Sequence, residues 1–381
     1  MEQMDECDAL VVGAGIAGAS LAYRLAPHRK VIVLERESAP GHHTTGRSAA
    51  SLSEALGTPV IRALTTLTRP FLASPPGGFS PVPLMRPLGW LFIARADQRA
   101  AYEEELAAAR ASCPTIDVLS VEEAVRRVPI LRPEYVRHAF LEPNAMALDV
   151  DAIHQGYLRG MRGSGGRVIT HAEVRAIERR GEAWTVETSA GRFRAPVLVN
   201  AAGAWADIVA RLAGARPIGL VPKRRTAMIL SAPDGIDNTS WPELDDVENE
   251  FYLKPEAGKF LASPADETPF EPCDVQPDEL DVAIAIDRIE RATTLKVKRV
   301  ERRWAGLRSF VADRNPVIGF DGKAPGFFWL AGQGGAGIQT SAGLSLAAST
   351  LILGEAWPTL LAERGIHPPD LSPERLDRPS A

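Results

Sequence analysis

The sequence predicts an α/β protein (α+β overall), in which a discontinuous Rossmann-like domain carries a second, mostly antiparallel β-sheet domain. A buried strand at residues 8–12 runs directly into a glycine-rich turn and a helix. A second strand–glycine–helix pattern follows far along the chain, at residues 327–353. Between the two lie strand-like segments separated by turns, which favour a separate sheet.

Size and composition are typical of a soluble protein with two joined domains. The chain has 381 residues, of which 45% are hydrophobic and 24% charged. Its formal net charge of −5 gives no electrostatic reason to expect nucleic acid as a partner. No long uninterrupted apolar run and no basic leader occur, so we expect no transmembrane segment, no signal peptide and a cytoplasmic location. Three cysteines without paired spacing predict neither disulfides nor a metal site.

The first glycine motif has the spacing of a dinucleotide-binding turn. Gly13 permits the tight turn, Gly15 lets a pyrophosphate approach the backbone, and Gly18 lets the helix pack on the strand. The start of the helix then offers free amides and the positive end of its dipole to phosphates. The motif therefore predicts cofactor contacts at Gly13, Gly15, Ile16, Ala17 and Gly18.

A second strand, at residues 30–34, ends at Glu35. A carboxylate at that position can bind both ribose hydroxyls of an adenosine and disfavours a 2′-phosphate. The two strands and the helix do not distinguish whether the dinucleotide is NAD or FAD.

The next segment, residues 41–59, favours FAD. Thr44, Thr45 and Ser48 offer hydroxyls, Arg47 offers a charge, and the small residues around them leave room for a ligand. Many flavoproteins run such a segment along the pyrophosphate and ribityl chain, whereas nicotinamide enzymes do not need one. The alternative is a flexible linker. His42 and His43 could attach a flavin covalently, but histidines on polar loops are commoner, so we expect non-covalent FAD.

The middle of the chain predicts the remaining elements. The Pro-rich residues 56–87 indicate a crossing into a second domain, and helices follow at residues 97–112 and 121–128. Asp149 or Asp151 is expected to cap a helix that ends at residues 163–166. A small β-meander comes next, and the strand at residues 197–200 is expected to return to the first sheet. That return is what a glutathione-reductase-type FAD-binding domain requires.

The rest of the chain completes both domains. Residues 220–303 alternate strand-like pieces with turns and predict the main sheet of a substrate domain. The glycine turn at residues 332–340 precedes an apolar helix, whose start could face the flavin or could simply pack. The predicted FAD-binding domain comprises residues 1–80, 146–218 and 303–381. The predicted substrate-binding domain comprises residues 81–145 and 219–302.

Taken together, these motifs resemble the FAD-dependent D-amino acid oxidase and dehydrogenase superfamily, which also contains glycine and sarcosine oxidases. The resemblance covers nearly the full length and rests on the motifs at residues 13–18, 35, 45–50, 200–205, 304–310 and 332–340. Within the superfamily, phrases such as GRSAA, VNAAGAW, FYLKP and WAGLRSF are most similar to the bacterial D-arginine dehydrogenase group.

The resemblance implies a set of binding residues. It implies further FAD contacts at Glu35, Arg36, Thr44, Thr45, Gly46, Arg47, Ser48, Ala49, Ala50, Ser51, Val174, Ala202, Gly203, Gly334, Gly335, Ala336, Gly337, Ile338 and Gln339. It implies substrate contacts from Arg225, Tyr252, Arg308 and the backbone of Gly335. The implied reaction oxidises the CH–NH2 group of a D-amino acid by hydride transfer to flavin N5, giving an imino acid and then a 2-oxo acid and ammonia. The electron acceptor stays open between oxygen, a quinone and another carrier.

Some positions depart from the resembled group. Ser51 and Leu56 stand where that group has a histidine and a tyrosine, and Leu88–Gly89 lacks the acid that binds a substrate guanidinium there. The substrate side chain is therefore open between basic and apolar. Glu243 and Asp245 are expected on a loop, either solvated or forming a relocated cation site.

Other functions compete with this hypothesis. The glycine motif alone is compatible with an NAD-dependent dehydrogenase. A glycine- or sarcosine-type amine oxidase of the same superfamily is a second alternative. A non-catalytic FAD-binding subunit of an oxidase complex is a third.

Overall fold

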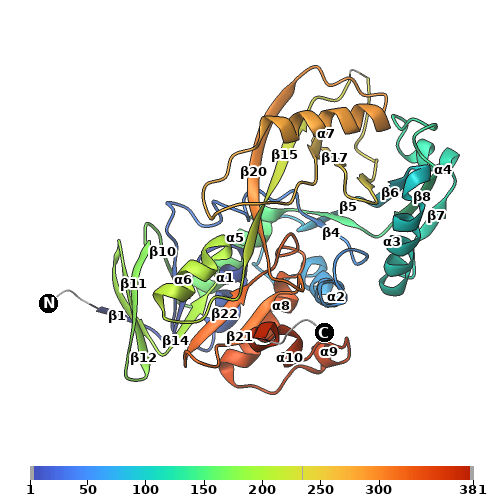
Figure 1. The fold of residues 1–381 in the computed structure, drawn as a ribbon. Coiled ribbons are helices and arrows are strands. Elements are labelled where there is room, and N and C mark those ends of the chain that lie inside the picture. Colours follow the sequence, from blue (N-terminus) through green and yellow to red (C-terminus); the bar gives the residue numbers. More distant parts are fainter. Residues whose placement is uncertain (1–3, 234, 378–381) are drawn as a thin grey trace.

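The computed structural model describes residues 4–233 and 235–377. These residues form four β-sheets, with six, nine, four and three strands. Figure 1 shows the six-stranded sheet with its helices in the lower body of the molecule and the nine-stranded sheet extending above it. The α/β class with two main sheets is confirmed.

The six-stranded sheet is the Rossmann-like core. Its strands, in spatial order, are β10 (Arg167–Ile169), β3 (Val31–Leu34), β2 (Ala9–Val12), β14 (Val197–Asn200), β22 (Phe327–Ala331) and β21 (Val317–Phe320). All neighbours are parallel except β21 and β22. The predicted return of residues 197–200 is confirmed, because β14 lies directly beside β2 with Val199 opposite Val11.

Strand β2 shows why its sequence is a continuous apolar run. Ala9 and Val11 belong to the hydrophobic cluster under helices α1 (Ile16–Leu25), α5 (Val150–Gly163) and α8 (Ser341–Leu353). Leu10 and Val12 belong to the cluster on the opposite face. The sheet is therefore buried on both faces, as parallel sheets usually are.

The opposite face is covered by the predicted meander and helix α6 (Ala206–Leu212). The meander consists of β11 (Val174–Arg180), β12 (Ala183–Thr188) and β13 (Gly191–Ala195), all antiparallel. Strand β1 (Met4–Glu6) adds to its edge in parallel with β13, which the sequence did not predict.

The nine-stranded sheet is mostly antiparallel. Its strands are β19 (Thr268–Pro269), β15 (Val221–Leu230), β18 (Lys259–Ser263), β17 (Tyr252–Glu256), β16 (Glu243–Asp246), β6 (Trp90–Ala94), β8 (His138–Glu142) and β7 (Asp117–Leu119), with β20 (Val300–Phe310) paired to β15. The parallel pair β16–β6 joins the two segments that contribute to this sheet. The predicted domain boundary at residue 303 falls inside β20, and the domain limits stay a prediction.

A further, three-stranded sheet is formed by short segments from residues 51–148. It consists of β4 (Ser51–Leu52), β9 (Met146–Leu148) and β5 (Met85–Pro87). Shorter helical turns complete the described chain: η1 (Ala96–Gln98), η2 (Gly203–Trp205), α9 (Thr359–Ala362), α10 (Pro368–Leu371) and η3 (Pro373–Asp377).

Three predicted helices are confirmed. They are α3 (Arg99–Ser112), α4 (Val121–Arg127) and α5, whose cap is Asp149. Asp149 Oδ1 accepts a hydrogen bond from Ala152 N at 2.8 Å, as an N-cap side chain does.

The longest helices that the sequence analysis did not predict are α2 (Pro59–Ala73) and α7 (Glu279–Ala292). In the Pro-rich segment, Thr58 caps helix α2 and Pro59 occupies its first turn, where a missing amide costs nothing. In the segment expected to be all strands, Asp278 caps helix α7, whose Val282, Ala285 and Ile289 are buried. No helix among the described residues is long and apolar enough to cross a membrane.

Candidate active site

The three glycines of the first motif have different structural roles. A Cβ at Gly13 would lie 2.4 Å from Ala201 O, and a Cβ at Gly18 would lie 2.0 Å from Gly13 O. These two glycines are required by the protein's own backbone. A Cβ at Gly15 would lie 3.2 Å from Thr45 Oγ1 and would otherwise project into open space. Gly15 therefore keeps a space open, and that space is part of a hollow.

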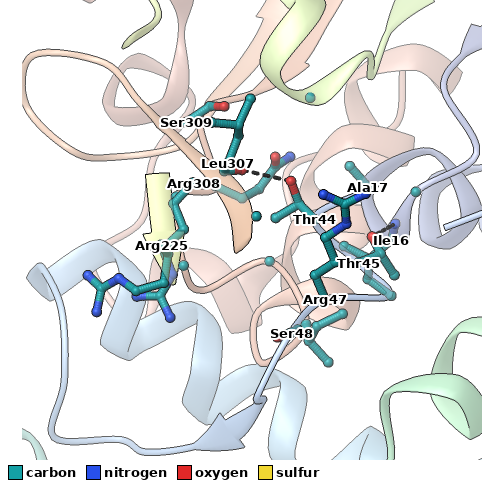
Figure 2. Close-up of a pocket in the computed structure, with 18 of the residues that line it drawn as sticks. Ile16, Ala17, Thr44, Thr45, Arg47, Ser48, Arg225, Leu307, Arg308 and Ser309 are labelled. Atoms are coloured by element: carbon teal, nitrogen blue, oxygen red, sulfur yellow. Dashed lines mark hydrogen bonds between the residues drawn. The ribbon is translucent and has the colours of Figure 1, made fainter. Parts of the chain in front are cut away.

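The turn is held by two side chains from elsewhere in the chain. Thr45 Oγ1 accepts a hydrogen bond from Ile16 N at 3.0 Å, at the first residue of α1 (Figure 2). Glu35 Oε2 accepts from Ala14 N at 3.1 Å, and Glu35 Oε1 accepts from Glu37 N at 3.0 Å. A carboxylate has about four lone-pair positions, so Glu35 retains capacity for ribose hydroxyls.

The hollow has two ends, which are continuous because several residues line both of them. One end is lined by Glu35, Arg36, Val174, Ala202 and Trp205, and the other by Ala17, Ser48, Arg308, Gly334 and Ile338. Both ends include Gly15, Thr44, Thr45, Ala201 and Gly203. The hollow therefore runs past the glycine turn as one elongated space, as a dinucleotide requires.

Most of the predicted cofactor residues line this hollow. They are Gly13, Gly15, Ile16, Ala17, Glu35, Arg36, Thr44, Thr45, Arg47, Ser48, Ala49, Val174, Ala202, Gly203, Gly334, Gly335, Gly337 and Ile338. Ala50, Ser51, Ala336 and Gln339 line a neighbouring hollow instead. Gly18 and Gly46 pack against the backbone of Gly13 and Gly41.

The segment rich in small residues is fastened to the nine-stranded sheet. Thr44 Oγ1 donates to Leu307 O at 2.7 Å (Figure 2), and Arg47 Nη1 donates to Ala305 O at 2.9 Å. Arg47 also forms an ion pair with Asp274. These contacts tie the segment to β20, so it is not a free linker, and much of the Arg47 charge is already paired.

Lys254 is a buried cation that the sequence reasoning missed. Its Nζ donates to Ala49 O at 2.6 Å and to Ala50 O at 3.1 Å. Burial lowers the pKa of Lys254, while the nearby Glu243 opposes that shift. Lys254 is two residues from Tyr252 on β17, so strand alternation could have placed both on one face.

The histidines His42 and His43 line the end of the hollow at Glu35. His43 Nε2 lies 2.9 Å from Glu37 Oε1, and its ring packs on Trp205. Arg225 and Arg308 line the opposite end. The two histidines therefore stand at the end that suits an adenosine.

The four predicted substrate residues come together where two hollows meet. Arg225, Tyr252, Arg308 and Gly335 line both the elongated hollow and a second one that extends towards β16. Arg225 on β15 is paired with Gly306 on β20, which places Arg308, two residues further, diagonally across the same face. Figure 2 shows the two arginines on one side of the pocket and Ile16, Thr44 and Thr45 on the other.

The electrostatics of this junction favour an anion. Burial lowers the pKa of Arg225 to about 10, and the Arg308 guanidinium adds to that effect. Arg225 is therefore still a cation at neutral pH. Glu267 lies 3.5 Å from Arg225 Nη2, but Glu267 is shared with Lys223 at 2.9 Å and Arg314 at 2.7 Å. Two like charges this close are unfavourable until an anion binds between them.

Gly335 sets the position of Arg308. A Cβ at Gly335 would lie 2.9 Å from Arg308 Nη1. The guanidinium therefore rests directly on the backbone of the second glycine turn, next to the elongated hollow.

The structure corrects the expectation for Glu243 and Asp245. Both lie on strand β16, not on a loop, and are only 3% and 5% exposed. The idea that they are solvated is wrong. Their strand pairs with β6, from residues 90–94, on one side and with β17 on the other, so both residues lie in the interior of the nine-stranded sheet.

Comparison with known proteins identifies the family. A family model described as "DAO: FAD dependent oxidoreductase" matches residues 8–351. The chain belongs to this family. Mitochondrial sarcosine dehydrogenase of Mus musculus is 26% identical over 273 residues, which are 67% of this chain and 29% of that protein. FAD-dependent oxidoreductase domain-containing protein 1 of Xenopus laevis is 23% identical over 414 residues, covering 93% of this chain and 81% of that protein.

Among solved structures, glycine oxidase from Geobacillus kaustophilus superposes with a TM-score of 0.81 at 20% identity, covering 95% of this chain and 98% of that one. That likeness concerns the fold. The chain spans less than a third of the sarcosine dehydrogenase it matches.

The cofactor of this family is FAD, and the hollow fits it. Gly15 leaves space beside the amides that begin α1, Glu35 lies where a ribose is expected, and the second glycine turn lines the far end. The alternative of an NAD-dependent dehydrogenase is therefore wrong.

Proposed function

We propose that the protein oxidises the CH–NH2 group of D-amino acids. The observation that carries this proposal is the pair of guanidiniums of Arg225 and Arg308 beside the Tyr252 phenol, at the junction of the FAD hollow and a second hollow. This set is suited to a small carboxylate whose next atoms must lie against the flavin.

Arg225 and Arg308 would bind the α-carboxylate, and the Tyr252 hydroxyl would donate a third hydrogen bond to it. Their strands β15, β20 and β17 belong to one sheet, so the carboxylate is fixed by a rigid support. The backbone of Gly335 lies beside Arg308 and would meet the amine. The reaction then depends mainly on positioning.

When bound, FAD supplies the acceptor for the hydride that leaves Cα, and water then hydrolyses the imine to a 2-oxo acid and ammonia. The carboxylate of a bound substrate would offset part of the positive charge of the two arginines, which favours a substrate with a free carboxylate. The acceptor that reoxidises the flavin, and the cytoplasmic location, stay predictions. So does a particular likeness to the D-arginine dehydrogenase group.

A second candidate is oxidation of glycine or N-methylglycine in the same site. It is supported by the match to sarcosine dehydrogenase over 67% of this chain. Both candidates need the same carboxylate anchors, so they differ only in what surrounds Cα and the nitrogen.

One experiment tests the proposal. FAD-loaded protein is mixed under anaerobic conditions with D-amino acids, L-amino acids, glycine and N-methylglycine, and flavin bleaching is followed at its visible band. Bleaching by D-amino acids is expected. Bleaching only by glycine and N-methylglycine would favour the second candidate, bleaching only by L-amino acids would overturn the D-preference, and a flavin that no amine reduces would indicate a non-catalytic subunit.

A further inference from the structure

We infer that Asp245 recognises a positively charged group at the far end of the substrate's side chain, so that the preferred substrates are amino acids with a second cation. This inference rests on the proposed function, because the carboxylate anchors define where the side chain begins.

The position of Asp245 is the first reason. Arg225, Tyr252 and Arg308 line both hollows, whereas Asp245 lines only the second one. A substrate held at the junction by its carboxylate therefore extends its side chain into the second hollow. Asp245 is paired with Tyr252 across β16 and β17, so it stands next to the anchor and on the side away from FAD.

The second reason is that Asp245 has unused bonding capacity. Its Oδ1 is buried and has no hydrogen-bond partner among the described residues. A buried polar atom without a partner is uncommon and costs free energy. A ligand that donates to this atom would remove that cost.

The neighbouring acids are already engaged. Glu243 Oε2 accepts from Ser51 Oγ at 2.6 Å, and Lys254 lies close enough to favour the ionised form of Glu243. Glu267 binds Lys223 and Arg314. Glu105 also lines this hollow, from α3, so Asp245 is the acid left for a ligand on the β16 side, next to the carboxylate anchors.

The surroundings of Asp245 suit a cation more than a neutral donor. Burial and the nearby Glu243 raise the pKa of Asp245 well above its ordinary value, and Arg225 opposes that shift. Burial therefore disfavours the ionised carboxylate, and a bound cation would supply the counter-charge that stabilises it. The charged and titratable groups near it are Glu243 on β16, Tyr252 on β17 and Arg225 on β15, and Asp246 acts on it from the other face of β16.

Trp90 adds an aromatic wall. It lines the same hollow from β6, opposite Glu243 in the β16–β6 register. Its buried Nε1 makes no hydrogen bond of normal geometry among the described residues, but it lies near the Asp245 carboxyl and favours its ionised form. An indole beside a carboxylate can accommodate an ammonium or a guanidinium over its face.

The test compares substrates that differ only in charge. The ratio of kcat/KM for D-arginine to that for D-citrulline, and for D-lysine to that for D-norleucine, is measured with the FAD-loaded protein. We expect the wild type to favour the charged member of each pair by about tenfold or more, since a charge-assisted hydrogen bond contributes about that much. A wild type that prefers the uncharged members would overturn the inference even if no variant could be purified.

Asp245→Asn is then compared with Glu243→Gln as a matched control on the same strand. Asp245→Asn should lower both ratios by about tenfold or more, whereas Glu243→Gln should change them by less than about threefold. Equal losses on charged and uncharged substrates in Asp245→Asn would show that Asp245 does not read the side chain. Failure of every amino acid to bleach the flavin would instead refute the proposed function, so the two failures are distinguishable.

Discussion

The two halves of the site are built in different ways. The half at the six-stranded sheet presents mainly backbone to the hollow: glycine turns, the first amides of α1 and small residues, together with Glu35 and Thr45. The half at the nine-stranded sheet presents side chains, namely Arg225, Tyr252, Arg308 and Asp245 from four different strands, which bind the substrate in the proposed function. FAD is the same molecule in every member of the family, so local backbone motifs can serve it. A substrate pocket has to be specified by side chains. Those side chains come together only through the register in which their strands pair.

This difference has an energetic side. In the cofactor half Glu35 and Arg47 already have hydrogen-bond or ion-pair partners, whereas the substrate half places two guanidiniums and several carboxyls in one partly buried space. Buried charges that are incompletely paired destabilise the empty protein. The substrate half therefore gives up stability that its ligand restores, and the following variants test the contrast.

The largest effect is expected at Gly15. In Gly15→Val the new Cβ would lie 3.2 Å from Thr45 Oγ1, and its two methyl groups would fill the space beside the amides of α1. FAD binding should be lost, which the visible absorbance of purified protein measures. Gly77→Val is the control, because a Cβ at Gly77 meets nothing within 4 Å. A Gly15→Val protein that remains yellow would show that the hollow is misassigned.

Arg308→Met comes next and tests the substrate half. Removing one partner of a desolvated charge pair typically costs about 2–5 kcal/mol, which corresponds to a loss of roughly 30-fold or more in kcat/KM. FAD content should not change, because the flavin is held by the other half. The control is Arg303→Met, on the same strand but paired with Glu279 at the surface. Normal kinetics in Arg308→Met would remove that residue from the site.

Tyr252→Phe should have a smaller effect. It removes a single hydroxyl from a buried ring, and a hydrogen bond from that hydroxyl to a carboxylate contributes about 1.5 kcal/mol, or roughly tenfold in kcat/KM. Tyr135→Phe, whose hydroxyl accepts from Arg95 at 3.1 Å, serves as the control outside the site. Equal kinetics for wild type and Tyr252→Phe would contradict a role for the phenol.

The smallest effect concerns stability and pH. The folded-state pKa of Asp245 is raised, so its contribution to stability is present at low pH and is lost as the pH rises towards that raised value. Asp245→Asn removes the titration and should therefore raise the melting temperature of FAD-loaded protein without substrate, by about 1–3 °C at pH 8. The gain should be smaller at pH 5.

Thermal unfolding of both proteins at the two pH values measures this difference. Glu243→Gln should show the same sign, because burial also raises the pKa of Glu243. A lower melting temperature for Asp245→Asn at pH 8 would mean instead that attraction to Arg225 dominates.

Some of the molecule followed from the sequence alone. The apolar run before Gly13, the glycine spacing and Glu35 after the second strand predict a dinucleotide turn, because each feature is a local requirement of the backbone. The strand at residues 197–200 and the glycine turn after residue 331 are local backbone features of the same kind, and they predict the rest of the FAD half. Within that half, the sequence missed helix α2, because Thr58 and Pro59 are both common in turns and only their joint role at a helix start reveals it.

The substrate half depended on tertiary structure. Whether Glu243 and Asp245 are solvated or buried is decided by the pairing of β16 with β6, about 150 residues away in the chain. That Lys254 holds the carbonyls of Ala49 and Ala50, and that Arg308 rests on Gly335, likewise depends on which strands become neighbours. The spacing of residues along a strand determines which of them share a face. Only the assembled sheet decides what that face meets.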